Sequence, residues 1–118
     1  MAATTIYRNL TPHVLSVRAL DGATVVIPPA PDGPARVIYD RLPPEQMSIA
    51  GHEISVSVAG SPREIIGLPD PADNTVYIVA KAVADAAPRH REDLVSPGKL
   101  IRDAGGNVVA CDGLTRRI

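Results

Sequence analysis

Hydrophobic and polar positions alternate over short runs that Pro and Gly residues interrupt, which is the pattern of a β protein. The strictest alternation spans residues 54–58 and predicts a strand that buries Ile54, Val56 and Val58 and exposes the serines between them. The most continuous apolar run spans residues 75–79 and predicts a strand covered on both faces. We expect this second strand at the centre of the fold.

The first quarter of the chain predicts three strands. Residues 4–7 and 14–20 carry β-branched or alternating side chains, and Thr11-Pro12 separates the two runs. Asp21-Gly22 is the strongest hairpin signal in the chain, and the apolar run 24–27 follows it directly.

The middle of the chain is divided by proline-rich segments. Residues 28–34 contain four prolines and predict an irregular loop, after which residues 35–39 predict a short strand. Residues 41–51 show no convincing period and are interpreted as a surface loop, whereas residues 64–66 form a candidate short strand.

The last third predicts one helix and one hairpin. Residues 80–87 are strong helix formers that stop at Pro88, which predicts about two helical turns. Residues 99–102 and 107–111 flank the Gly-containing segment 103–106 and predict a hairpin. Residues 1–118 thus predict a single β-rich domain, mainly β, built as a small antiparallel barrel or sandwich with one short helix.

Composition narrows the class of partner. The 118 residues carry a formal net charge of −1, so we expect no non-specific nucleic-acid binding. No run approaches the length of a membrane span and the N-terminal segment lacks an apolar signal region, which favours the cytoplasm and no membrane partner. The only aromatic residues are three tyrosines, so we expect Val, Ile, Leu and Ala to fill the core, and a homo-oligomer would supply further burial.

The turn around Pro12 combines an amide, a hydroxyl and an imidazole, contributed by Asn9, Thr11 and His13. One interpretation is a turn whose side chains satisfy nearby backbone groups. The other is a rigid rim of donors and acceptors for a polar ligand, in which His13 can change charge near neutral pH.

The densest charge cluster spans residues 89–93, directly after the predicted helix. One interpretation is a solvated face in which acidic neighbours neutralise the arginines. The other is an anion site in which Arg89 or Arg91 binds a phosphate or carboxylate and Asp93 orients the guanidinium. Arg36 and Tyr77, on predicted strands, complete this set of candidate ligand-binding residues.

Catalytic and metal motifs are missing from the sequence. No serine has a G-x-S-x-G context, the three histidines lack metal-ligand spacing, and the glycines fit no phosphate-binding loop. Cys111, the only cysteine, lies in an apolar strand pattern that favours a buried small side chain over a thiolate. We therefore expect no enzyme, no metal and no cofactor.

Several motifs together carry a resemblance. Residues 9–13 read Asn-Leu-Thr-Pro-His, residues 67–69 read Gly-Leu-Pro, and the tail reads Arg-Glu-Asp-Leu-Val-Ser-Pro-Gly over 91–98, then Arg-Asp at 102–103 and Gly-Asn at 106–107. This pattern resembles a group of small phage, prophage and actinobacterial proteins, and it implies a phage-linked accessory protein of the bacterial cytoplasm. The usual Ser after Tyr-Ile-Val in that group is Ala80 here, so a hydroxyl role at this point is not expected.

Three functional hypotheses follow. The first is a binding protein that sequesters a small anionic, nucleotide-like ligand, such as a host immune signal, without destroying it. The second is a phage virion or morphogenesis protein, which needs no ligand pocket. The third is a small hydrolase that uses His13.

Overall fold

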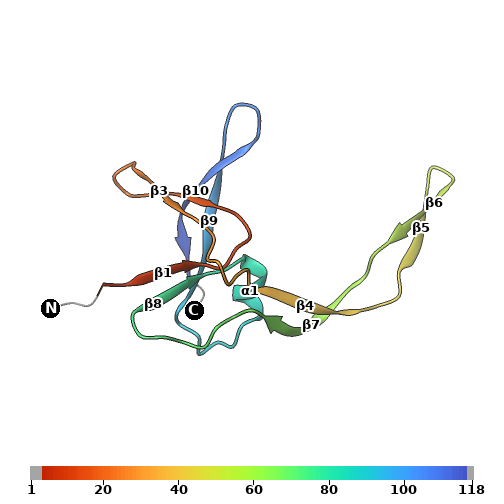
Figure 1. Ribbon diagram of the computed structural model, residues 1–118. Helices are drawn as coiled ribbons and strands as arrows, with labels where there is room; N and C mark the ends of the chain where they lie inside the picture. Colours follow the sequence, from red (N-terminus) through yellow and green to blue (C-terminus); the bar gives the residue numbers. More distant parts are fainter. Residues whose placement is uncertain (1–3, 117–118) are drawn as a thin grey trace.

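The computed structural model describes residues 4–116, shown along the chain in Figure 1. In chain order the elements are β1 (Ile6–Asn9), β2 (Leu15–Arg18), β3 (Thr24–Ile27), β4 (Arg36–Arg41), β5 (Glu45–Ile49), β6 (His52–Val56), β7 (Ala59–Ile66), β8 (Thr75–Ile78), α1 (Lys81–Ala86), β9 (Leu94–Arg102) and β10 (Val108–Thr115). The chain is thus mainly β with one short helix, as the sequence predicts.

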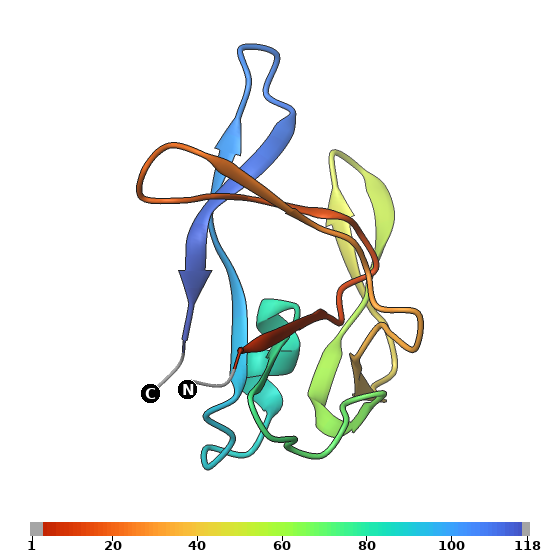
Figure 2. The same cartoon turned by 60° about the vertical axis from the view of Figure 1, so that its left-hand side comes forward.

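Six strands form one sheet in the order β1-β8-β9-β10-β2-β3. The two edges of this sheet come together where Asn9, at the end of β1, forms an isolated parallel bridge with Pro29, just after β3. The backbone N–H of Ala30 donates to the carbonyl of Asn9 at 2.8 Å. The sheet is therefore nearly closed and barrel-like, and the ring of strands is visible in Figure 2.

The barrel-like sheet is mixed, whereas the sequence predicts antiparallel pairing. β1 with β8, β8 with β9, and β10 with β2 are parallel, while β9 with β10 and β2 with β3 are antiparallel hairpins. The parallel pairs join strands that long connections separate, as parallel pairing requires. Local hairpin signals reveal only the antiparallel pairs.

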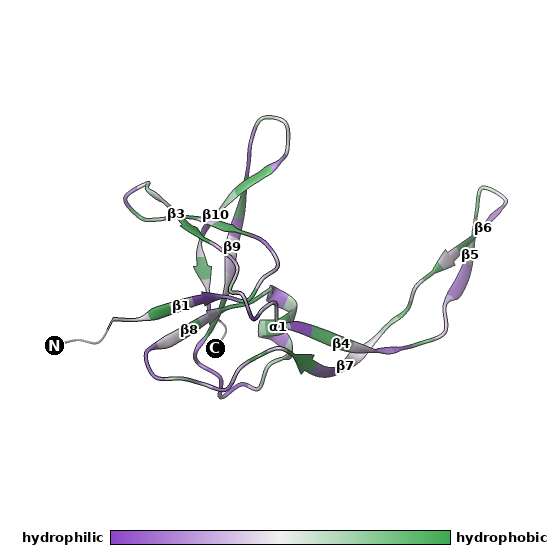
Figure 3. Ribbon diagram, viewed as in Figure 1, coloured by the Kyte–Doolittle hydropathy of each residue, from purple (hydrophilic) through white to green (hydrophobic). Residues whose placement is uncertain are grey.

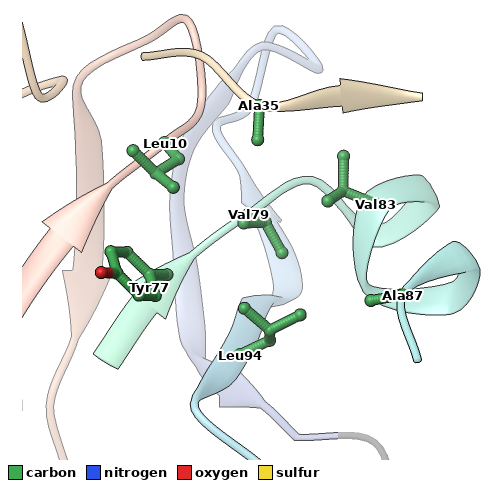
Figure 4. Packing of buried hydrophobic residues seen from close by; sticks show 7 residues of the cluster. All are labelled: Leu10, Ala35, Tyr77, Val79, Val83, Ala87 and Leu94. Carbon is green, nitrogen blue, oxygen red and sulfur yellow. The ribbon is translucent and has the colours of Figure 1, made fainter. Parts of the chain in front are cut away.

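β8 is buried on both faces, which confirms the predicted covering of this strand, and it stands second in the sheet, between β1 and β9. Its register places Tyr77 beside Leu94 and Ile78 beside Val95, and all four side chains are buried. Because neighbours along a strand point to opposite faces, Tyr77 and Ile78 serve different faces of the sheet. The face of Tyr77 carries the hydrophobic cluster of Figure 4, whose seven members are Leu10, Ala35, Tyr77, Val79, Val83, Ala87 and Leu94.

Helix α1 confirms the predicted helix and covers this cluster. Val83 on the helix and Ala87 at its end are both buried there, and the backbone N–H of Ala87 donates to the carbonyl of Val83 at 3.0 Å. Pro88 follows directly, so the helix ends where the sequence predicts its end.

Both predicted hairpins of the barrel-like sheet are present. At the first, Gly22 adopts φ 87° and the carboxylate of Asp21 accepts the backbone N–H of Ala23 at 2.9 Å. At the second, the Asp103 carboxylate accepts the backbone N–H groups of Gly105 and Asn107 at 2.9 and 3.0 Å. Turn residues therefore close these loops through their own side chains.

Residues 36–66 leave the sheet as one long β ribbon, which we call the arm (Figure 1). β4 pairs antiparallel with β7 at its base, and β5 pairs antiparallel with β6 at its tip. The loop predicted for residues 41–51 is therefore wrong, because β5 occupies Glu45–Ile49. Ala50 and Gly51, with φ 51° and 81°, form the two-residue connection, and positive φ at both positions suits the twist of a hairpin.

The prediction of a buried face over residues 54–58 is also wrong. The alternation is real, since Val56 and Val58 are half-buried and the serines beside them are exposed. Ile54, however, is 42% exposed, because no other described element packs over the tip of the arm. The pattern indicates which side is apolar but not what covers it.

The arm makes the molecule elongated and gives it a large accessible surface area. The radius of gyration is 17.8 Å, against about 13.5 Å for a compact chain of this length. The accessible surface is 8573 Å², about 2,400 Å² more than size scaling gives for a compact monomer. Large hydrophobic side chains are among the exposed residues of both the arm and the sheet.

Candidate functional site

The turn predicted as a ligand rim is built around a buried asparagine. Asn9 is 1% exposed and its amide nitrogen donates to the carbonyls of His13 at 2.8 Å and Ile27 at 3.0 Å. Its amide oxygen accepts the backbone N–H of Thr11 at 2.9 Å and the Thr11 hydroxyl at 2.6 Å. The bond to Ile27 ties the end of β1 to the end of β3, where the sheet closes, and the other three bonds hold the turn that follows β1.

His13 contributes its backbone rather than its ring to this network. Its carbonyl also accepts the hydroxyl of Thr11 at 3.1 Å, while the residue itself is exposed. Buried polar groups with all partners inside the protein are typical of structural turns. In the single chain the geometry therefore matches the structural interpretation of Asn9 and Thr11.

Arg91 and Asp93 form the most enclosed ion pair among the described residues, with side chains 9% and 16% exposed. Arg91 Nε and Nη2 donate to the two carboxylate oxygens of Asp93, each at 2.9 Å, which is a bidentate fork. Nη2 also donates to the carbonyl of Pro69 at 2.9 Å. The guanidinium thus holds the loop before β8 against the start of β9.

This pair shifts both pKa values. The hydrogen bond from Arg91 lowers the pKa of Asp93 below its ordinary value, against the opposing effect of burial. The same hydrogen bond raises the pKa of Arg91, again against desolvation. Asp93 therefore acts as a fixed carboxylate that orients Arg91, but it also neutralises much of the charge that an anion would seek.

Tyr77 lies beside this pair, and the other two predicted arginines are on the surface. The backbone N–H of Tyr77 donates to the carbonyl of Asp93 at 2.8 Å, and the Tyr77 hydroxyl donates to the carbonyl of Asp70 at 3.2 Å. Arg36 and Arg89 are exposed. The structure therefore brings together Tyr77, Arg91 and Asp93, while the hydrogen bonds of Asn9 and Thr11 form a separate network.

Two hollows lie on either side of Tyr39 at the base of the arm. None of the predicted site residues lines them. The first, of about 390 Å³, lies between Tyr39 and helix α1 and includes Lys81. The second, of about 490 Å³, lies between Tyr39 and the middle of the arm and includes Arg41. Tyr39 is 42% exposed, so its ring borders both spaces.

The tip of the arm presents a continuous apolar face that sequence reasoning assigned to the core or to a loop. Paired residues of two antiparallel strands share a face, and the register pairs Met47 with Ile54, Ile49 with His52, and Glu45 with Val56. Met47 and Ile49 are 53% and 58% exposed. We call Met47, Ile49, Ile54 and Val56 the apolar arm face.

A second apolar feature lies on the barrel-like sheet. A groove of about 190 Å³ runs along β2, β9 and β10, and its apolar side chains include Val14, Leu15, Leu100, Val108, Val109 and Cys111. Val14, Leu100, Val108 and Val109 are each 50–57% exposed. We call this the sheet groove. Cys111 is itself buried, as its strand pattern predicts.

Residues 4–116 contain no side-chain cluster that could hold a metal ion and no helix that could cross a membrane. Within that range no cluster of three or more His, Cys, Asp or Glu side chains is placed to bind a metal ion. Over the same residues, no helix has the length and apolarity that crossing a membrane requires.

No protein-family model, no curated protein and no solved structure matches the chain.

Proposed function

We propose that this protein is a self-associating subunit of a larger protein assembly, and that it acts through protein contacts rather than through a catalytic centre. The observation that carries the proposal is the exposed apolar arm on a chain with about 2,400 Å² more surface than a compact monomer. A standard interface takes about 800 Å² from each partner, so the surplus corresponds to more than one such contact.

The chemistry of the exposed surface supports this proposal. Large apolar side chains stand out on the arm, on β3 and on the hairpin of β9 and β10, and Figure 3 shows green segments in these projecting parts. Contiguous apolar surface of this kind marks interaction sites in water-soluble folds. The resemblance to phage proteins suggests a virion or morphogenesis role in the bacterial cytoplasm as the biological setting.

The test is the mass of the full chain in solution over a wide dilution series. Sedimentation velocity and light scattering should show a species of two or more chains that dissociates on dilution. A monomer at every concentration contradicts the proposal.

Sequestration of a small anionic ligand is the second candidate, and the hollows beside Tyr39 favour it. Ligand pockets are commonly about 300–1,000 Å³, and both hollows fall in that range at 390 and 490 Å³. An exposed ring stacks well on a nucleobase. Lys81 in the first hollow is paired with Asp85 at 2.9 Å, so the guanidinium of Arg41 in the second hollow, beside Asp40, is the group that would bind a phosphate.

Equilibrium dialysis with labelled cyclic dinucleotides and cyclic ADP-ribose isomers tests this second candidate. Binding that Tyr39→Ala abolishes, with unchanged ligand recovered after heat denaturation, supports sequestration at the hollows. Binding that survives Tyr39→Ala but is lost in Arg91→Lys returns the site to the predicted arginine cluster. A converted product supports an enzyme instead, and no binding at all contradicts the candidate.

A further inference from the structure

We propose that the apolar arm face of one copy docks into the sheet groove of a second copy of this chain. The inference rests on the proposed self-association and names the two surfaces that make the contact. Its first support is that both surfaces are uncovered in one chain. The arm projects away from the barrel-like sheet, so its tip does not cover the groove of its own chain (Figure 1).

The two surfaces match in chemistry and in size. Met47 and Ile54 form a paired apolar ridge on the arm, and the groove offers Leu100 and Val109 among its walls. The groove volume of about 190 Å³ is below the about 300–1,000 Å³ of small-molecule sites. It therefore suits one or two inserted side chains better than a ligand.

Charge around the contact is also complementary. Glu45 pairs with Val56 and so lies on the side of the arm that carries Met47 and Ile54, whereas Glu53 pairs with Ser48 on the opposite side. Strands β5 and β6 contain no Lys or Arg. In β9, Arg102 lies two residues after the groove residue Leu100, on the same face of the strand by alternation, and is exposed. A carboxylate on the arm face and a guanidinium beside the groove fix the orientation of the contact and favour association.

The surface available also fits this arrangement. A contact between arm and groove uses two different patches, so each chain contributes its arm to one contact and its groove to another. Two contacts of standard size bury about 1,600 Å² per chain. The surplus of about 2,400 Å² accommodates both. A contact between two arm tips would leave the groove and its exposed apolar walls uncovered.

The first experiment compares Met47→Glu with Gln46→Glu in the full chain. Both substitutions add one negative charge to β5, but Gln46 pairs with Ser55 on the polar face of the arm. Both residues are exposed in the single chain, so neither variant is expected to unfold it. Met47→Glu should weaken association by about tenfold or more, because docking would bury an unpaired carboxylate. Gln46→Glu should assemble like wild type.

The second experiment identifies the surface that the arm contacts. His52 is exposed on the side of the arm that carries Ile49, and p-benzoyl-phenylalanine at this position reports its neighbours. Mixed isotopically labelled and unlabelled chains are irradiated and digested. The expected product joins the arm of one chain to residues 100–111 of a differently labelled chain.

The outcomes separate this inference from the proposed function. An assembly that persists in Met47→Glu, or whose crosslinks join two arms, overturns the arm-to-groove contact but leaves self-association standing. A wild-type chain that is monomeric at every concentration overturns both. Crosslinks to the groove together with the difference between the two variants support the inference.

Discussion

Strand β8 and the tip of the arm carry the two strongest strand patterns of the sequence, yet their environments are opposite. Ile78 in β8 has 0% of its surface exposed, whereas Ile54 in β6 is 42% exposed. β8 has a strand on each side and helix α1 over the cluster on one face. The hairpin of β5 and β6 has only its own two strands. Strand formation therefore follows the local pattern, but burial depends on what the rest of the chain, or another chain, supplies.

The largest predicted effect is the difference between the same substitution in these two regions. Ile78→Ala should lower the free energy of unfolding by about 2–5 kcal/mol, because it leaves a cavity in a closed environment. Ile54→Ala should cost less than about 1 kcal/mol in dilute protein, since its side chain already contacts water. Urea unfolding followed by circular dichroism measures both. Equal costs would contradict the distinction between sheet and arm.

The second predicted effect concerns the closure of the barrel-like sheet. Asn9→Ala should lower the free energy of unfolding by about 2–4 kcal/mol, because it removes four hydrogen bonds and leaves buried backbone groups without partners. His13→Ala serves as the control within the same turn and should change stability by about 0.5 kcal/mol or less, since its side chain is exposed. A larger loss of stability in His13→Ala than in Asn9→Ala would show that the imidazole, and not the Asn9 amide, stabilises the turn.

The third prediction is a pH dependence that arises in the sheet region. Because the folded pKa of Asp93 lies below its unfolded value, the Arg91 contact stabilises the fold fully above about pH 4. This stabilisation is lost as the pH falls through the lowered folded pKa, when the carboxylate becomes protonated. Unfolding free energies measured from pH 6 downward should therefore decline below about pH 4.

Asp93→Asn is the variant that checks this cause. It should cost about 1–3 kcal/mol near neutral pH, because Arg91 loses a bidentate charged partner. It should also flatten the decline in acid. Asp103, whose pKa is lowered mainly by the backbone N–H of Asn107, contributes a remaining slope that Asp103→Asn isolates. An unchanged acid profile in Asp93→Asn would show that other carboxylates control it.

The sequence predicts local elements well because turn chemistry is local. Gly22, Pro88 and the segment around Gly106 mark real boundaries, and their backbone angles or missing N–H groups explain why. The continuous apolarity of β8 also predicts its two covered faces correctly. What the local pattern omits is pairing between distant segments, including the parallel pair of β10 with β2.

The candidate site illustrates the same limit. A cluster containing Asn9, Thr11 and His13 is visible in the sequence, but only the fold shows that its polar atoms join β1 to β3.

The strand β5 was missed because Ala50-Gly51 is a weaker hairpin signal than Asn-Gly or Asp-Gly. Its alternation of Gln46, Met47 and Ser48 was the signal available.

The smallest predicted effect concerns the connection between β5 and β6 at the tip of the arm. Ala50 adopts a φ of 51°, in the left-handed region that Asn tolerates better than Ala. Ala50→Asn should therefore stabilise the hairpin of β5 and β6 by about 0.5 kcal/mol, which corresponds to about twofold slower amide exchange in these strands. Gly51→Ala, at φ 81°, should accelerate the same amides because a Cβ is strained there. In dilute protein neither change should alter exchange in β8, since the two regions share no strand pairing. Hydrogen-exchange mass spectrometry resolves the segments, and a parallel change in β8 would mean that arm and sheet unfold as one unit.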